Sequence, residues 1–176
     1  MRDATAVITS RTQFNELLLD RMHRCKVIVR TGVGVDNISL PHAGAKGITV
    51  CNVPHYCADE VADHTAALML ALLRKIVVAA RATRNGRWLT SGDLTPLARI
   101  SGLTLGMIGF GHIAQEVARR ALAFKIRLIV SDPFVSSEAI AAAHAVKVDL
   151  DTLYRDADIV SIHLPLTHET HHLIGG

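Results

Sequence analysis

The sequence has few aromatic residues, few cysteines and no long apolar run. Aromatic residues make up 4% of the 176 positions, although hydrophobic residues together make up 49%. That much apolar surface excludes a disordered chain, because its burial offsets the conformational entropy lost on folding. The longest apolar run covers the eight residues 66–73, whereas a membrane-spanning helix needs about 20. We therefore expect a globular protein that has no membrane partner.

The few cysteines and the start of the chain bear on the cellular compartment. Cys25, Cys51 and Cys57 form no C-x-x-C pair and cannot all be bridged to one another, which is typical of free thiols in a reducing compartment. The first ten residues contain no long apolar stretch, so no signal peptide is predicted. The sequence thus favours a cytoplasmic protein. Its net charge of +3 is only a weak indication of an anionic partner.

Short β-rich runs alternate with helix-compatible stretches along the chain. This alternation is typical of an α/β fold with a parallel sheet and crossover helices. Helices are expected over 14–23 and 40–45 in the first part of the chain. The predicted strands are 6–9, 26–29, 48–51, 105–108, 128–130 and 159–162.

A long segment without glycine or proline extends over 58–84, and Asn85 and Gly86 follow it as a stop signal. We predict one continuous helix there, about 40 Å long. Such a helix often bridges two domains or carries a subunit interface. The apolar residues that fall on one face of this helix are Val61, Leu68, Leu72 and Ile76.

Three arginines recur every three residues towards the end of that segment, at Arg81, Arg84 and Arg87. We interpret them as a solvated or interfacial face whose charge complements the helix dipole. Nucleic-acid binding remains the weaker alternative, and no nucleic-acid partner is predicted.

The predicted strand 105–108 leads into the sequence Gly-Phe-Gly-His-Ile-Ala at 109–114, a G-x-G-x-x-A motif. Gly109 permits a tight turn out of the strand, and Gly111 allows a pyrophosphate to approach the backbone closely. Ala114 sets the packing distance between helix and strand. The phosphate oxygens would then meet the N–H groups at the start of the following helix.

An acidic residue follows at the spacing that a dinucleotide requires. Asp132 ends the next predicted strand, 21 residues beyond Gly111, where a carboxylate accepts hydrogen bonds from the adenosine ribose. It would repel a 2′-phosphate, and the segment 131–137 contains no arginine or lysine. NAD is therefore favoured over NADP. A further strand, 159–162, ends at His163, and the carboxyl ends of such strands line the nucleotide crevice.

Six sequence blocks, read together and in order, resemble the D-isomer-specific 2-hydroxyacid dehydrogenase family. They are RTGVGVDN at 30–37, CNVP at 51–54, DEVADH at 59–64, GFGHIA at 109–114, SDP at 131–133 and HLPLTHET at 163–170. The family includes phosphoglycerate dehydrogenases, hydroxypyruvate and glyoxylate reductases, and NAD-sensing corepressors. The resemblance implies an oxidoreductase that reduces a 2-keto acid to a D-2-hydroxy acid with NADH. A non-catalytic, corepressor-like NAD-binding scaffold is the alternative.

The resemblance also implies two domains and a dimer. Residues 1–53 would form part of a flavodoxin-like substrate domain. Residues 54–176 would form part of a Rossmann-like NAD-binding domain, which opens with the helix 58–84. That helix would pack against a partner subunit in a homodimer.

Site residues follow from the resemblance position by position. The backbone N–H groups of Val33 and Gly34 would hold the substrate carboxylate. Asp132 would bind the ribose. The residues that would cradle the pyrophosphate are Gly109, Gly111, His112 and Ile113, and those that would line the cofactor crevice are His163, Leu164, Pro165 and Thr170.

The chain departs from the family pattern at both ends. Family members begin with a further stretch of substrate domain before the point where Met1 falls, and they continue past Gly176. The family's catalytic Arg, Glu and His lie beyond the Pro-Leu-Thr block, so no residue of this sequence matches them. We expect a chain truncated at both ends, with no catalytic residue of its own and no turnover by itself.

One motif points to a different chemistry. His168, Glu169 and His172 match H-E-x-x-H, in which two histidines one helical turn apart bind Zn²⁺ beside a general base. That arrangement needs a long helix and a third ligand. The motif here starts three residues after Pro165, and only four residues follow it. We therefore predict no metal site.

Overall fold

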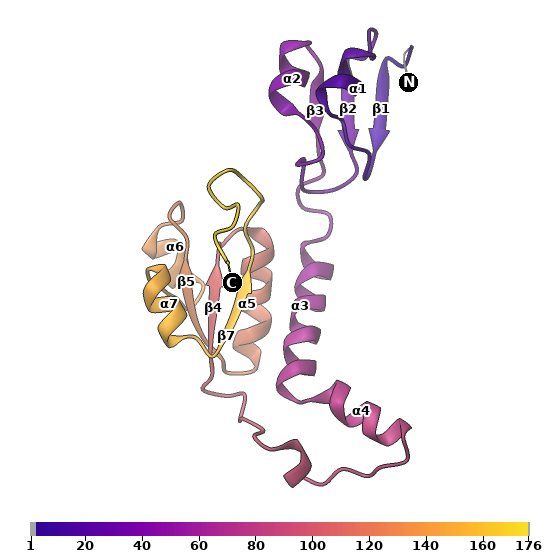
Figure 1. The fold of residues 1–176 in the computed structure, drawn as a ribbon. Helices are drawn as coiled ribbons and strands as arrows, with labels where there is room; N and C mark the ends of the chain where they lie inside the picture. Colours follow the sequence, from indigo (N-terminus) through magenta and orange to yellow (C-terminus); the bar gives the residue numbers. More distant parts are fainter. Residues whose placement is uncertain (1–2, 176) are drawn as a thin grey trace. The chain divides into compact units, whose positions relative to one another are not determined.

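The computed structural model describes residues 3–175, which fall into two compact units (Figure 1). The first unit contains the described residues up to Tyr56 together with those from Pro165 onward, and the second runs from Cys57 to Leu164. Each unit has its own parallel sheet. The α/β fold class predicted from the sequence is confirmed. The assignment of 1–53 and 54–176 to a substrate and a cofactor domain stays a prediction.

The first unit is a three-stranded sheet in the order β1-β2-β3. Its elements are β1 (Ala6–Thr9), α1 (Glu16–Asp20), β2 (Val27–Arg30), α2 (Leu40–Ala45) and β3 (Thr49–Cys51). Helix α1 begins later than predicted because Asn15 caps it: the Asn15 side chain accepts a hydrogen bond from the N–H of Leu18 at 3.0 Å. Phe14 lies outside the helix in the core of this unit, which is formed by Phe14, Leu19, Met22, Cys25, Ile28, Ile38, Ala43 and Ile48.

The second unit is built on a four-stranded parallel sheet in the order β6-β5-β4-β7. Its sheet elements and their crossover helices are β4 (Thr104–Ile108), α5 (His112–Ala123), β5 (Arg127–Ser131), α6 (Ser137–Ala142), β6 (Ala145–Lys147), α7 (Leu150–Asp156) and β7 (Ile159–Ile162). Strand β6 and helices α6 and α7 were not predicted from the sequence. The strand order reverses at β4, since β5 and β6 lie on one side of it and β7 on the other.

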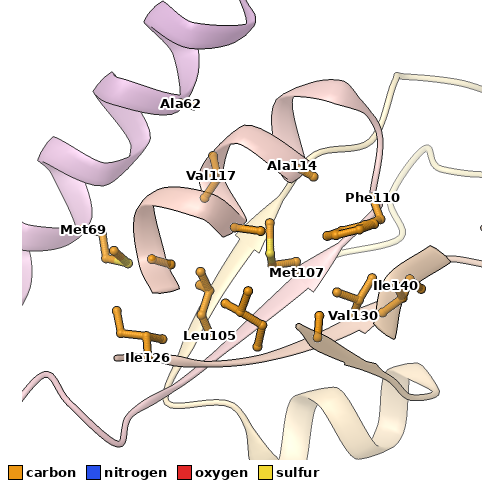
Figure 2. Close-up of a cluster of buried hydrophobic side chains, with 14 residues drawn as sticks. Ala62, Met69, Leu105, Met107, Phe110, Ala114, Val117, Ile126, Val130 and Ile140 are labelled. Atoms are coloured by element: carbon orange, nitrogen blue, oxygen red, sulfur yellow. The ribbon is translucent and has the colours of Figure 1, made fainter. Parts of the chain in front are cut away.

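Helices cover both faces of this sheet. Every residue of β4 is buried, as expected for a central parallel strand. Leu105 and Met107 point into the core that α3 (Ala58–Leu73) and α5 share with the sheet (Figure 2). Gly106 faces the opposite side, where a Cβ atom would lie 2.8 Å from side-chain atoms of Leu153 and Ala157, on and just after α7. This close packing fixes α7 against the sheet.

The single helix predicted over 58–84 is wrong, because the structure has two helices there. Helix α3 ends at Leu73 and α4 (Ile76–Arg84) begins after Lys75. Lys75 has a left-handed φ of 52°, which a continuous right-handed helix excludes. Helix α4 opens with three β-branched residues, 76–78, whose helix propensity is low. A 3₁₀ turn (Gly92–Leu94) lies in the connection to β4.

Helix α3 buries two alanines and one methionine and exposes several of its larger apolar side chains. Ala62, Ala66 and Met69 are buried, and Ala62 and Met69 join the core (Figure 2). The predicted apolar stripe lies on the surface: Val61, Leu68, Leu72 and Ile76 are 37%, 59%, 77% and 53% exposed. No helix in the described part of the chain is long and apolar enough to span a membrane.

Candidate cofactor-binding site

The predicted cofactor residues of the second unit meet at the carboxyl edge of its sheet. Parallel strands end at the same edge, and a ligand crevice opens where the strand order reverses. Here the reversal lies between β4 and β7. The glycine-rich turn follows β4, Asp132 follows β5, and His163 and Leu164 follow β7. The fold therefore brings these segments to one edge.

Gly109 is required by both its backbone conformation and its surroundings. Its φ is +86°, in the left-handed region. A Cβ atom at this position would lie 2.8 Å from the carbonyl oxygen of His163 and 2.8 Å from a methyl group of Leu164. The turn after β4 therefore approaches the end of β7 more closely than any residue with a side chain would allow.

Gly111 is the N-cap of α5 and faces open space. A Cβ atom there would meet nothing within 4 Å. Helix α5 begins at His112, and no side chain of the cap residue covers its first turn. His112 is exposed, Ile113 is partly buried, and Ala114 is fully buried against the core. The positive end of the helix dipole thus adjoins the glycine turn, which is an arrangement suited to phosphate.

The Asp132 carboxylate organises two loops at once. Its Oδ2 accepts a hydrogen bond of 2.8 Å from the backbone N–H of Phe110, inside the glycine turn. Its Oδ1 accepts hydrogen bonds from the N–H groups of Phe134 and Val135 at 2.8 and 3.1 Å. Ionised carboxylate oxygens offer about four lone-pair sites, so acceptor capacity remains for a ligand hydroxyl. Asp132 is partly buried.

His163 lies at the end of β7 and is partly buried. Its Nε2 is 2.9 Å from the hydroxyl oxygen of Ser161, and its backbone N–H donates to the carbonyl of Ile108 on β4 at 2.8 Å. Burial lowers the pKa of its imidazole from the usual value of 6.5. Burial thus favours the neutral form of the ring.

A hollow beside Asp132 contains residues that sequence reasoning missed. It is lined by Ser131, Asp132, Pro133, Lys147, Val148, Asp149, Leu150 and Thr152. Lys147 is the last residue of β6, and Val148 comes directly after it. That three-residue strand was not predicted from the sequence. Knowing that a fourth strand ends at this edge would have identified them.

The remaining predicted residues lie in the first unit. The side-chain amide of Asn52 donates to the carbonyl of Val33 at 2.7 Å. Gly34 is exposed, and among the described residues the N–H groups of Val33 and Gly34 have no hydrogen-bond acceptor. In the C-terminal loop the Thr170 hydroxyl donates to the carbonyl of Pro165 at 2.7 Å. Thr170 thus shapes that loop.

The H-E-x-x-H segment does not form a helix. Residues 168–172 form successive turns, and His172 has a left-handed φ of 57°. In the part of the chain that the structure describes, no group of three His, Cys, Asp or Glu side chains is arranged to hold a metal ion.

Comparison with known proteins gives a consistent match. Residues 66–176 match the family model described as D-isomer specific 2-hydroxyacid dehydrogenase, NAD binding domain. The chain is 39% identical to a hydroxypyruvate reductase from Thermotoga maritima over 96% of its own length and 53% of that protein. It is 38% identical to a D-3-phosphoglycerate dehydrogenase from Archaeoglobus fulgidus over 96% of its length and 32% of that protein.

A solved structure agrees with these matches. The crystal structure of D-lactate dehydrogenase from Aquifex aeolicus, complexed with NAD and lactic acid, is similar with a TM-score of 0.92 and 31% identity. That similarity covers 98% of this chain and 52% of the other. The chain therefore spans about half the length, or less, of the relatives it matches.

Proposed function

The chain belongs to the D-isomer-specific 2-hydroxyacid dehydrogenase family, and from this membership we propose that it takes part in the NADH-dependent reduction of a 2-keto acid to a D-2-hydroxy acid. The relatives named above are a hydroxypyruvate reductase, a phosphoglycerate dehydrogenase and a lactate dehydrogenase. These names favour an oxidoreductase over the corepressor-like scaffold.

The arrangement of Asp132 and the glycine turn carries the proposal. The turn leaves no room for a side chain at Gly109 and open space at Gly111, so a pyrophosphate could approach the N–H groups of His112 and Ile113. Asp132 keeps acceptor capacity for the ribose while it holds the turn through Phe110. The residues present thus fit a dinucleotide.

The hollow beside Asp132 suits the adenine ring. Pro133, Val148 and Leu150 provide apolar walls next to the carboxylate that would bind the ribose. His163 and Leu164 would line the crevice on the other side of the glycine turn, and Pro165 and Thr170 would follow them.

Bound NADH would supply the hydride, and the residues of this chain would bind and orient the reactants. The N–H groups of Val33 and Gly34 would hold the substrate carboxylate, so residues 1–53 would act as part of the substrate domain and 54–176 as part of the cofactor domain. We therefore expect the 176-residue polypeptide to bind NADH.

Calorimetric titration of the purified chain with NADH tests the proposal. We expect saturable binding, weaker binding to Asp132→Ala, and weaker binding of NADPH because its 2′-phosphate meets the Asp132 carboxylate. The matched control is Asp156→Ala, which removes an exposed carboxylate at the end of α7 and should bind NADH like the unsubstituted chain. Absence of NADH binding by the unsubstituted chain would overturn the proposal.

We also propose that a second copy of the chain covers the exposed apolar surface of α3 and α4. Leu68, Leu72, Val77 and Val78 are each more than half exposed. A homodimer would bury them, and burial of apolar surface stabilises the dimer by about 25 cal/mol per Å².

We place the protein in the cytoplasm, which fits its three free cysteines.

Sedimentation of the chain over a range of concentrations tests the dimer. We expect Leu72→Lys to shift the population towards monomer, because a charge would have to be buried in the interface. Leu17→Lys changes an equally exposed leucine of α1, in the first unit, and should leave the association unchanged. A monomer at all concentrations would exclude the dimer.

A further inference from the structure

Lys147 lies at the carboxyl end of β6, which neighbours β5 in the sheet. Its ammonium Nζ donates a hydrogen bond of 2.6 Å to the carbonyl oxygen of Val135. Val135 belongs to the loop that follows β5 and begins with Asp132. A side chain of one strand thus holds the loop of the next.

The bonds made by Lys147 and by Asp132 converge on the same short segment. The N–H groups of Phe134 and Val135 donate to Asp132 Oδ1, and the Val135 carbonyl accepts from Lys147. The segment is therefore held by a carboxylate on its N–H side and by an ammonium on its carbonyl side. Hydrogen bonds to ionised groups are roughly twice as strong as those between neutral groups. Together they fix one loop conformation.

The loop is in turn connected to the glycine motif. Asp132 Oδ2 accepts from the N–H of Phe110, so a continuous series of hydrogen bonds runs from Lys147 through Val135 and Asp132 to the turn after β4. A shift of the loop would move the carboxylate that faces the ribose. It would also disturb the turn that faces the pyrophosphate.

The surrounding charges argue against Lys147 as a phosphate-binding residue. Asp132 and Asp149 line the same hollow. Glu138 is also nearby: its pKa is lowered by its own backbone N–H, by Ser136 and, to a lesser degree, by the charge of Lys147. Among the described residues, no carboxylate lies within ion-pair distance of the Lys147 ammonium. One cation among three acids attracts no additional anion, and its direct partner is the Val135 carbonyl.

We propose that Lys147 is a positioning residue for cofactor binding, which fixes the loop 132–135 and with it the orientation of the Asp132 carboxylate towards the ribose hydroxyls. This inference rests on the proposed function, because it assumes that Asp132 binds the ribose. It adds a residue that neither the glycine motif nor the spacing to Asp132 indicates.

A double-mutant cycle tests the inference. NADH is titrated calorimetrically into the unsubstituted chain and into Lys147→Met, Asp132→Ala and the double variant. We expect Lys147→Met to weaken NADH binding about fivefold, since it removes a hydrogen bond made by a charged group. In the Asp132→Ala background the same change should have no further effect. Lys147→Arg restores a cationic donor and should recover most of the affinity.

The readout separates positioning from simple stabilisation. A lysine that only stabilised the fold would weaken binding equally in both backgrounds, and that result would overturn the inference. Equal affinities of the unsubstituted chain and Lys147→Met would overturn it as well, while leaving the proposed function intact. Absence of NADH binding by the unsubstituted chain would overturn both. If the Met variant does not fold, Lys147→Gln replaces it in the cycle. We then expect a smaller loss of NADH affinity, which is again absent in the Asp132→Ala background.

Discussion

Gly109 is subject to two constraints that can be measured separately. A positive φ disfavours any L-residue with a side chain. The carbonyl oxygen of His163, 2.8 Å from the position of a Cβ atom, adds a steric constraint. Gly102 has only the first constraint, because its φ is +95° and nothing lies within 4 Å of its Cβ position.

Gly109→Ala should therefore cost more stability than Gly102→Ala. We expect about 1 kcal/mol for Gly102→Ala, from backbone strain alone. For Gly109→Ala we expect about 3 kcal/mol, since the ends of β4 and β7 must also move apart. Urea unfolding of the two variants measures the difference. Equal losses would show that the approach to His163 is relaxed without cost.

His163 gives the second unit a pH-dependent stability. Burial lowers the pKa of its imidazole in the folded chain, so below pH 6.5 the unfolded chain takes up this proton first. Stability is therefore unaffected above that pH and falls as the pH drops through 6.5 towards the folded-state pKa. His163→Gln removes the titrating group and leaves an amide near Ser161.

The free energy of unfolding of His163→Gln should accordingly fall less than that of the unsubstituted chain between about pH 7.5 and about pH 5.5. Urea unfolding at several pH values measures both. His171→Gln, in the exposed C-terminal turn, serves as control and should retain the original dependence. If the free energy of unfolding depended on pH in the same way for His163→Gln and the unsubstituted chain, the pH dependence would not come from His163.

At the scale of elements, Arg120 anchors α3 to α5. Its Nε is 2.6 Å from the Asp63 carboxylate, and its guanidinium also binds Asp59 at 3.0 Å. On its own helix it binds Glu116 at 3.3 Å. The hydrogen bonds that Arg120 donates to Asp63 and Asp59 raise its pKa further above its usual range. This network lies beside the apolar contact made by Ala62 and Met69.

Arg120→Met should loosen α3 without unfolding the sheet. We expect faster hydrogen exchange in the first turns of α3 and unchanged exchange in β4, because β4 is buried by α5 and α7 as well. The control is Arg119→Met: Arg119 is more exposed and, among the described residues, pairs only with Glu116 of its own helix. Equal exchange in the two variants would show that the apolar contact suffices to dock α3.

Several elements could be predicted from the sequence because their signals are local. The apolar runs around 105–108 and 159–162 matched β4 and β7, and the glycine motif located the start of α5. Strand β6 has three residues, and only Ala145 of them is fully buried, so it gave no periodic signal. The break between α3 and α4 was missed because its left-handed residue is a lysine. Consequently Lys147, at the end of an unrecognised strand, was missed as well.

For the site residues, too, local spacing was predictive and the contacts made in the folded chain were not. Spacing alone placed Asp132 beside the glycine motif, yet its bonds to Phe110, Phe134 and Val135 depend on loop geometry that no spacing encodes. Of the predicted apolar stripe, Val61, Leu68 and Leu72 lie on α3 and are exposed, whereas Ile76 lies on α4, beyond the helix break. The packing of α3 against α5 relies on Ala62 and Met69 instead, and the small side chain of Ala62 allows the two helices to approach closely.

At the scale of the whole molecule, the two sheets have separate cores. The core around Phe14 and Ile28 belongs to the first unit, and the core around Met107 and Phe110 belongs to the second. A ligand that binds only the folded state stabilises the unit that holds it. The glycine turn and Asp132 both belong to the second unit.

NADH should therefore stabilise the two sheets unequally. At an NADH concentration of about 100 times Kd we expect about 2.7 kcal/mol of added protection against global opening of the second unit, seen as slower hydrogen exchange in β4 and β5. Exchange in β1 and β2 should not change. In Asp132→Ala the protection should decrease in β4 and β5 at the same NADH concentration, because fewer sites are occupied. Equal protection of both sheets would instead mean that the chain opens as one cooperative body, with the cofactor coupled to each core.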